Sequence, residues 1–157
     1  MEIWKEKCKG MWKHDDKNVK GFFGDYRYLS NFHVADVEID GIKYPSSENA
    51  YQAFKVIKEE RHKFINVSPK ESKEIWKELT LKYNGEIWDK KIKKHVMFSV
   101  LICKFSQNED FKNKLISTGN KYLEETNWWK DFYWGVCYGL GDNNLGKQLM
   151  IIREILR

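Results

Sequence analysis

The chain has 157 residues and a mass of 18.9 kDa, which fits one domain better than two. Hydrophobic residues make up 41% and charged residues 32%, and 28 Lys and Arg against 23 Asp and Glu leave a net charge of +5. Aromatic residues reach 15%, which excludes a disordered chain. No apolar run approaches the roughly 18 residues of a membrane span, and the N-terminus lacks the apolar stretch of a secretory signal.

Cysteines and histidines give no framework or metal motif. The three cysteines, Cys8, Cys103 and Cys137, are widely spaced and have no CxxC pattern. We therefore expect reduced thiols and a cytoplasmic location. The four histidines are also far apart, so no metal site is expected. Many lysines alternate with glutamates, as on solvated helix faces, and the basic excess is weak evidence for duplex DNA binding.

The first 20 residues are rich in lysine and show no sustained hydrophobic period. We predict an N-terminal arm over residues 1–20, with one short element around Ile3 and Trp4, and a domain over residues 21–157. No internal repeat or interdomain linker is evident. The fold class predicted is α+β, a single mostly helical domain with a small β-sheet.

The first elements of this domain carry strong local signals. Residues 34–44 alternate in hydrophobicity around Asp40-Gly41, a pair that tolerates positive φ, which predicts a β-hairpin. A serine at position 46 or 47 then caps a helix that runs to about Phe64. Five further segments follow: a helix from the capping box at 68–71 to about Leu81, where Asn84-Gly85 breaks the chain; a helix over 87–105; a short helix between Asn108 and Gly119; an aromatic loop over 126–142; and a final amphipathic helix.

Four polar or aromatic residues share one stripe of the helix after the hairpin. Glu48, Tyr51, Gln52 and Lys55 are spaced i, i+3, i+4 and i+7, which places them on one side, away from the apolar face. An ordinary solvated face explains this pattern. Tyr51 and Gln52 are unusual on such a face, however, and a site in which polar groups converge on Glu48 is the alternative.

The second cluster is an aromatic loop followed by a glycine loop. Five aromatic residues fall within 128–134, and they either stack on a planar base or fill a core. The segment GDNNLGK at 141–147 leads into the last helix. Its backbone N–H groups either hold a phosphate or only cap the helix.

Taken together, these segments are more specific than any one of them. The order YLSNF, DGIKYPSSENAYQAFK, SPKESKEI, KFSQN, TGNKYLEE, DFYWG and GDNNLGKQLM resembles the NADAR family of YbiA-like proteins over roughly residues 21–157. The resemblance implies a small α+β hydrolase of N-glycosidic bonds. The substrates implied are phosphoribosylamino-pyrimidine intermediates of riboflavin synthesis, or ADP-ribosylated guanine as a small molecule or in nucleic acid. No cofactor, metal or membrane partner is implied.

The stripe and the resemblance together assign site residues. The catalytic candidates are Glu48, Lys55 and Asp131. The substrate-binding candidates are Ser30, Asn31, Phe32, Tyr51, Gln52, Glu125, Trp134, Gly135, Asn143 and Gly146. The chain departs from the family pattern at Trp76-Lys77, where Gly-Arg is common, and at Ile87, where Asp is common and an upstream Arg is missing. These departures indicate a difference in substrate preference.

Cleavage of a ribosyl C1′–N bond passes through an oxocarbenium-like state, which favours a nearby carboxylate. Lys55 has two possible roles: as an ammonium it would hold a phosphate or the leaving group, and as a free amine it could attack C1′ and form a Schiff base. Two other functions stay open. One is a binding module for ADP-ribose or a nucleotide, and the other is a nucleic-acid-binding protein whose affinity falls steeply with salt.

Overall fold

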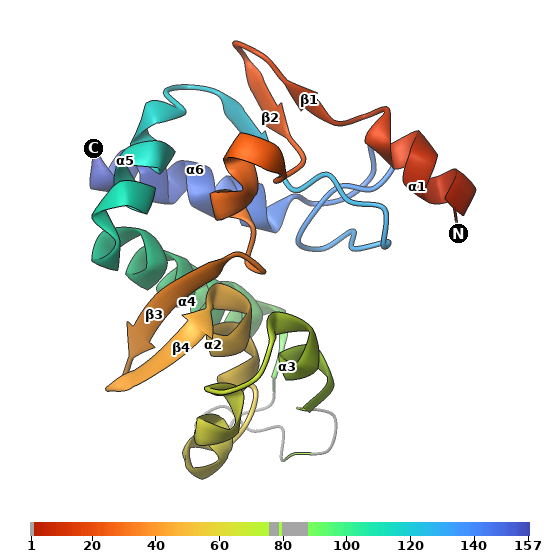
Figure 1. The fold of residues 1–157 in the computed structure, drawn as a ribbon. Coiled ribbons are helices and arrows are strands. Elements are labelled where there is room, and N and C mark those ends of the chain that lie inside the picture. Colours follow the sequence, from red (N-terminus) through yellow and green to blue (C-terminus); the bar gives the residue numbers. More distant parts are fainter. Residues whose placement is uncertain (1, 76–78, 80–87) are drawn as a thin grey trace. The chain divides into compact units, whose positions relative to one another are not determined.

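The computed structural model describes residues 2–75, 79 and 88–157 (Figure 1). The predicted helix end near Leu81, the break at Asn84-Gly85 and the family departures at 76, 77 and 87 lie outside the described residues. The chain forms two compact units, Asn31–Glu109 and the combination of Met1–Ser30 with Asp110–Arg157. Among the described helices, none has the length and apolar character needed to cross a bilayer.

The unit over residues 31–109 starts with the predicted hairpin. Strands β3 (Val34–Ile39) and β4 (Ile42–Ser46) are antiparallel, and Asp40 and Gly41 form the turn between them with φ of 54° and 75°. A positive φ at two successive positions is the geometry that a tight hairpin turn requires. The hairpin prediction is confirmed.

Helix α2 (Ser47–Ala53) begins directly after β4, and Ser46 caps it by accepting a hydrogen bond from the Asn49 N–H at 3.1 Å. The predicted cap is therefore confirmed, but the predicted length is wrong. The helix ends at Ala53, and a separate 3-10 helix, η2 (Lys58–Phe64), follows. The break falls at Val56 and Ile57, because Val56 is fully buried and Ile57 is extended. β-Branched residues also have low helix propensity, which favours a break at this point.

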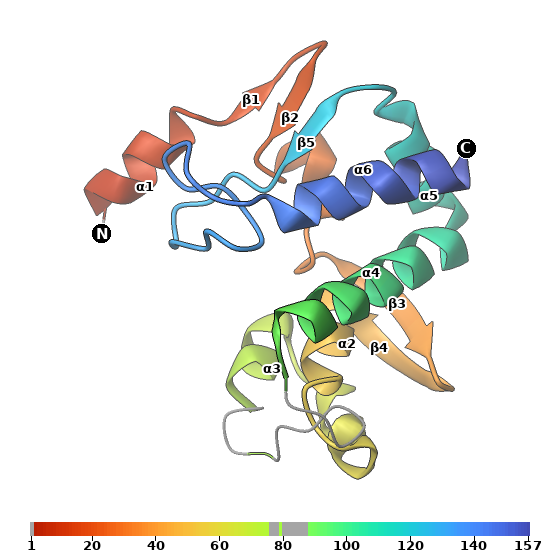
Figure 2. The ribbon, with the colours of Figure 1, turned by 180° about the vertical axis from the view of Figure 1, so that it is seen from behind.

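Two more helices complete this unit. Helix α3 (Pro69–Ile75) has the predicted capping box, in which the Ser68 N–H donates to Glu71 Oε2 at 2.7 Å and the Glu71 N–H donates to Ser68 Oγ at 3.2 Å. Helix α4 (Lys90–Gln107) is capped by Asp89 and packs against β3 and α2 (Figure 2). These contacts close the core of the unit over the inner face of the hairpin.

The other unit contains helix α1 (Glu2–Lys9) and a three-stranded sheet. Strand β2 (Asn18–Lys20) pairs antiparallel with β1 (Lys13–His14) and parallel with β5 (Tyr122–Glu124), so β2 is the middle strand (Figures 1 and 2). The sequence analysis expected no strand in this segment. Strands of two and three residues are too short to show a period of two, and the pairing with β5 depends on residues about 100 positions away.

The remaining elements of this unit are the 3-10 helix η1 (Gly24–Leu29), helix α5 (Glu109–Ser117), which begins at the unit boundary, and helix α6 (Asn144–Leu156). Gly119 follows α5 with φ of 61°, as the predicted helix end requires. Leu145, Leu149 and Ile152 of α6 are buried, and α6 packs against β5. The predicted α+β class is confirmed.

Candidate active site

Glu48, Tyr51 and Gln52 lie in α2, and Lys55 follows two residues after its end. The expectation that this stripe faces away from the core is wrong. Glu48 and Gln52 are 6% and 2% exposed, and every residue of α2 is buried. The reason is that α2 contacts β3, β4, η2, α3 and α4, which enclose it on several sides. A carboxylate buried in this way needs specific partners.

Glu48 is held by its backbone and by its side chain. Its N–H donates to the Asn31 carbonyl oxygen at 3.0 Å, and Gln52 Nε2 donates to Glu48 Oε1 at 2.6 Å. Asn31 is itself fixed, because its Oδ1 accepts from Ser47 Oγ at 3.1 Å and its Nδ2 donates to Met97 Sδ at 3.4 Å. The SNF and SSENAYQ segments, far apart in sequence, thus come together around one carboxylate.

Lys55 lies among aromatic rings and other lysines. Its Nζ is 5.0 Å from the Tyr51 ring centroid and 6.0 Å from the Trp88 ring centroid. Burial lowers the pKa of Lys55 to about 8, Lys93 and Lys73 lower it further, and Glu48 acts in the opposite direction. On the order of a tenth of the molecules then carry the free amine at pH 7. Lys55 is therefore available as a nucleophile at a pH where an ordinary lysine is not.

The sequence analysis missed the surroundings of Lys55. Trp88 packs edge to face against Tyr51 with ring centroids 5.7 Å apart, and Lys73 Nζ lies 5.3 Å from the ring centroid of Phe32. A tryptophan directly before a helix cap and a lysine in α3 are ordinary in sequence. Only their packing around α2 gives them a role, so no local pattern marks them.

In the other unit, Asp131 shapes the loop that carries Trp134. Asp131 Oδ1 accepts from the backbone N–H groups of Tyr133 at 3.1 Å and Trp134 at 2.8 Å. Asn127 closes the same loop, since its Nδ2 donates to the Asp131 carbonyl oxygen at 2.8 Å and its Oδ1 accepts from the Asp131 N–H at 3.1 Å. One carboxylate oxygen of Asp131 thus orients Trp134.

The aromatic residues of this loop do not form a closed core. All five between 128 and 134 are at least partly exposed, and Trp129 and Phe132 are 49% and 44% exposed. Tyr133 and Trp134 pack edge to face with centroids 4.9 Å apart. Exposed rings of this kind are suited to stacking on a planar base, which favours the binding alternative over core filling.

Asn143 and two glycines hold the backbone at Glu125. Asn143 Oδ1 accepts from the Glu125 N–H at 3.1 Å, and its Nδ2 donates to the Leu123 carbonyl oxygen at 2.9 Å. A Cβ at Gly135 would collide with the Glu125 carbonyl oxygen, and a Cβ at Gly146 with that of Leu123. These three residues of the predicted site therefore position the end of β5.

The start of α6 makes contacts that bear on the predicted phosphate site. The backbone N–H groups of Asn143, Asn144 and Leu145 donate to the carbonyl oxygens of Gly135, Tyr133 and Trp134 at 3.3, 3.3 and 3.0 Å. They tie the glycine loop to the aromatic loop, and we do not assign phosphate binding to these three groups.

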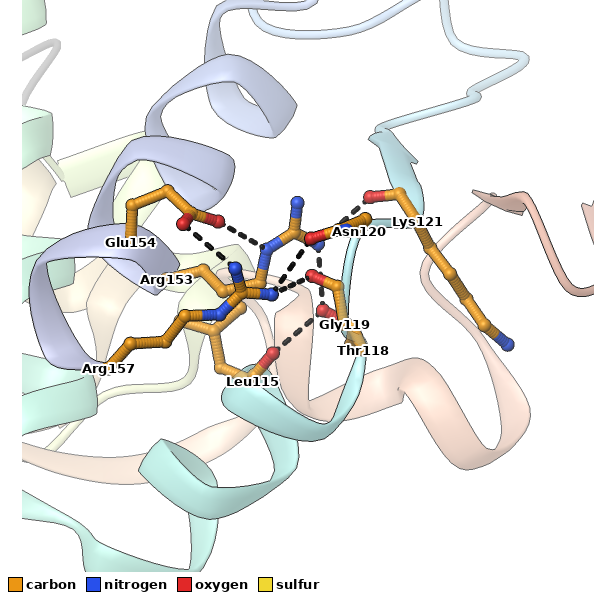
Figure 3. Close-up of polar contacts among 8 residues, drawn as sticks. All are labelled: Leu115, Thr118, Gly119, Asn120, Lys121, Arg153, Glu154 and Arg157. Atoms are coloured by element: carbon orange, nitrogen blue, oxygen red, sulfur yellow. Dashed lines mark hydrogen bonds and ion pairs between the residues drawn. The ribbon is translucent and has the colours of Figure 1, made fainter.

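The far end of α6 fixes the loop that leads into β5 (Figure 3). Arg153 is buried, and its Nη1 donates to Thr118 Oγ1 at 2.9 Å and to the Lys121 carbonyl oxygen at 2.8 Å. Arg157 Nη2 donates to the Gly119 carbonyl oxygen and to Asn120 Oδ1. Both ends of α6 thus hold the segment that presents Glu125.

The structure groups the predicted residues into two sets. The first, in the unit over 31–109, contains Asn31, Phe32, Glu48, Tyr51, Gln52 and Lys55. The second, in the other unit, contains Glu125, Asp131, Trp134, Gly135, Asn143 and Gly146, together with Ser30, whose Oγ accepts from Arg27 Nη1 at 3.2 Å. That the two sets line one pocket stays a prediction. Within the described part of the chain, no group of three or more His, Cys, Asp or Glu side chains could hold a metal ion.

Comparison with known proteins places this arrangement in a family. The NADAR domain model matches residues 12–157, and the chain belongs to the NADAR family. It is 33% identical over 138 residues to N-glycosidase YbiA of Escherichia coli strain K12, covering 84% of this chain and 82% of YbiA. It is 29% identical over 138 residues to N-glycosidase Npun_R5314 of Nostoc punctiforme, covering 84% and 86%.

Two further comparisons extend this result. The chain is 30% identical over 142 residues to riboflavin biosynthesis protein VVA0006 of Vibrio vulnificus, which covers 85% of this chain but 36% of that protein. The NMR structure of E. coli YbiA matches with a TM-score of 0.75 and 30% identity, covering 92% of this chain and 87% of that one. The fold of YbiA is therefore the fold of this chain.

Proposed function

We propose that this protein is an N-glycosidase that hydrolyses a ribosyl C1′–N bond. The observation that carries the proposal is the arrangement on α2, where a buried carboxylate fixed by Gln52 accompanies a lysine whose pKa is lowered to about 8. Relatives at 29 to 33% identity that carry the name N-glycosidase support the same activity. Binding alone would need neither a buried Glu48 nor a Lys55 of lowered pKa, which favours an enzyme over a binding module.

The chemistry follows from these two groups. The unprotonated Nζ of Lys55 attacks C1′, the C1′–N bond breaks, and the departing base takes up a proton. The ring then opens to a Schiff base between Nζ and C1′, and water hydrolyses it to return the free amine and release the sugar. Glu48 stabilises the positive charge that develops at C1′ in the attack. The steps balance without a metal or an organic cofactor.

The second set of residues supplies contacts to the base in this proposal. Trp134 and the exposed rings beside it stack on a planar heterocycle, and Asp131 and Glu125 supply carboxylates for its N–H groups. Relatives named as riboflavin biosynthesis proteins support a phosphoribosylamino-pyrimidine as substrate. ADP-ribosylated guanine, free or in nucleic acid, offers the same bond and the same kind of base.

Incubation of the purified protein with a phosphoribosylamino-pyrimidine and with an ADP-ribosylated guanine nucleoside tests the proposal. Release of ribose phosphate or ADP-ribose is expected with at least one of them, in the presence or absence of EDTA. Absence of cleavage for both, together with tight ADP-ribose binding, would establish the binding module instead. Affinity for unmodified nucleic acid that falls steeply with salt, without cleavage, would favour the third function.

A further inference from the structure

The side chain of Gln52 has one half that is used and one half that is not. Its Nε2 donates to Glu48 Oε1 at 2.6 Å, and the residue is 2% exposed. Its Oε1 is buried, and among the described residues it has no hydrogen-bond partner. A buried acceptor left in this way costs about 1–3 kcal/mol, and native structures contain few of them.

The amide cannot relieve this by turning over. Reversal would put Oε1 against the Glu48 carboxylate oxygen at the distance where Nε2 now donates, and two acceptors at 2.6 Å repel each other. As long as Glu48 is ionised, its carboxylate therefore fixes which end of the Gln52 amide faces it. The acceptor end is directed away from Glu48 and can be satisfied only by a donor that comes from outside these two residues.

The position of this acceptor connects it to the chemistry. Gln52 lies one helical turn after Glu48 and three residues before Lys55. A ribosyl N-glycoside that approaches both groups carries neutral donors close to the reacting carbon, namely the ribose hydroxyls and the amine groups of the base. A donor at this point would satisfy the buried oxygen without disturbing the charge of Glu48.

We propose that Gln52 Oε1 accepts a hydrogen bond from an O–H or N–H group of the substrate, and that Gln52 thereby selects N-glycosides that carry this donor. The inference rests on the proposed N-glycosidase activity and adds a specificity role to it. Sites built to bond a substrate donor reject analogues without it by about 10⁴-fold or more, because the polar group of the site is then left unpaired. Gln52 is thus both a positioning residue for Glu48 and a determinant of substrate choice.

The test compares each parent substrate with three analogues, which lack the 2′-hydroxyl, the 3′-hydroxyl or one amine group of the base. For the wild type we expect kcat/KM to fall by about 10⁴ for one analogue, and that analogue identifies the donor. In Gln52→Met, which keeps the side-chain length but has no acceptor, the ratio should shrink to about 10 or less. Turnover of the parent also falls there, because Glu48 loses its donor.

Two further variants separate selectivity from structure. Gln107→Met is the matched control, since Gln107 bonds the backbone of Glu38 on the exposed side of the hairpin, and its ratio should equal that of the wild type. Gln52→Glu, protonated beside Glu48, keeps an acceptor oxygen and should keep the preference. This rescue would not be expected of a residue that only fills space.

The outcomes are distinct. If the wild type cleaves neither parent substrate, the proposed function fails and this inference fails with it. If the wild type cleaves a parent but discriminates against none of its three analogues, only the inference is overturned, whether or not Gln52→Met folds. A folded Gln52→Met variant with the wild-type ratio also overturns the inference and leaves the proposed activity standing.

Discussion

Glu48 is the residue at which folding and chemistry can be separated by an isosteric change. Glu48→Gln keeps the volume of the buried side chain, and either end of the new amide can pair with Gln52. We therefore expect thermal unfolding close to that of the wild type. The loss of the negative charge near C1′ should lower turnover by about 10²- to 10⁴-fold. Calorimetry and product release measure the two effects.

Glu38→Gln is the matched control for this change, because Glu38 is exposed on β3 of the same unit. It should alter neither stability nor turnover by a measurable amount. A folded Glu48→Gln variant with undiminished cleavage would remove Glu48 from the mechanism.

Lys55 makes a prediction about pH. Its pKa in the folded protein is about 8, against an ordinary value of 10.5. Because the nucleophile is the free amine, kcat/KM should rise as pH increases through about 8 and then level off. Borohydride added during turnover should trap a covalent adduct, and peptide mass analysis should locate it at Lys55. If Lys55 acted only as an ammonium, activity would instead fall as pH rises through 8, and no adduct would form.

The same pKa has a consequence for stability. The folded state disfavours the ammonium, so between pH 8 and 10.5 the unfolded state binds more protons at Lys55 than the folded state does. The free energy of unfolding should therefore gain from Lys55 as pH rises through this window, and Lys55 should be destabilising below it. Lys55→Met should raise the unfolding free energy at pH 7 by about 1 kcal/mol while abolishing turnover, as is common for functional residues. Denaturant unfolding at pH 7 and pH 10 checks both signs, and a variant less stable than the wild type at pH 7 would contradict the argument.

At the scale of elements, the end of β5 depends on a close approach by α6. Gly146→Ala would drive a methyl group into the carbonyl oxygen of Leu123, a fully buried residue, and into the side chain of Asn143. Backbone cannot yield as a flexible side chain can, so we expect a loss of about 1–3 kcal/mol of unfolding free energy. Gly10→Ala, at the end of α1 where the nearest atom is 3.4 Å from the new methyl group, is the control and should change little. Equal stabilities of the two variants in urea would show that the close approach is unimportant.

Several elements were predictable because their signals are local. The turn at Asp40-Gly41, the cap at Ser46 and the capping box at Ser68 each depend on residues within three positions of one another. Burial of the stripe on α2 was not predictable in this way. It depends on Asn31 and on Met97 of α4, which lie 17 and 49 positions from Glu48 in sequence, and no period within α2 reports contacts of that kind.

The candidate site shows the same division. The residues of the two sets could be named from motifs, but their roles could not. Asn143 was expected to bind phosphate, and the structure shows its side chain bonded to the backbone of β5. Trp88 was a landmark only, and the structure places its ring beside Lys55. Chemistry-bearing residue types are visible in sequence, whereas their partners are set by packing between distant elements.

At the scale of the whole molecule, the two units are interleaved in sequence. The chain leaves the first unit at Ser30 and returns to it at Asp110, so the residues between form the second unit as a continuous segment. Glu48 and Lys55 belong to this segment, and the aromatic and glycine loops belong to the other unit. A change that unfolds one unit should therefore be detectable apart from a change in the reacting groups of the other.

The N-terminal 20 residues provide the test at this scale. The family match begins at residue 12, and β2 is the middle strand of the sheet, with Val19 fully buried opposite Leu123. By contrast, α1 precedes the family match, and its Lys5 Nζ lies 5.3 Å from the Trp128 ring centroid. A cation–π contact of this kind contributes about 0.5–1 kcal/mol at an exposed site.

A chain that starts at residue 12 should therefore fold, unfold within a few degrees of the full-length protein and keep its turnover. A chain that starts at residue 21 loses β1 and β2, which leaves β5 without its parallel neighbour and exposes Leu123 to water. We expect this shorter chain to show no cooperative thermal transition by circular dichroism. Lys5→Ala serves as the control, because it removes the one cation–π contact and should match the 12–157 chain in stability. A cooperative transition of the 21–157 chain near that of the full-length protein would mean that the first 20 residues are an arm, as their composition alone suggests.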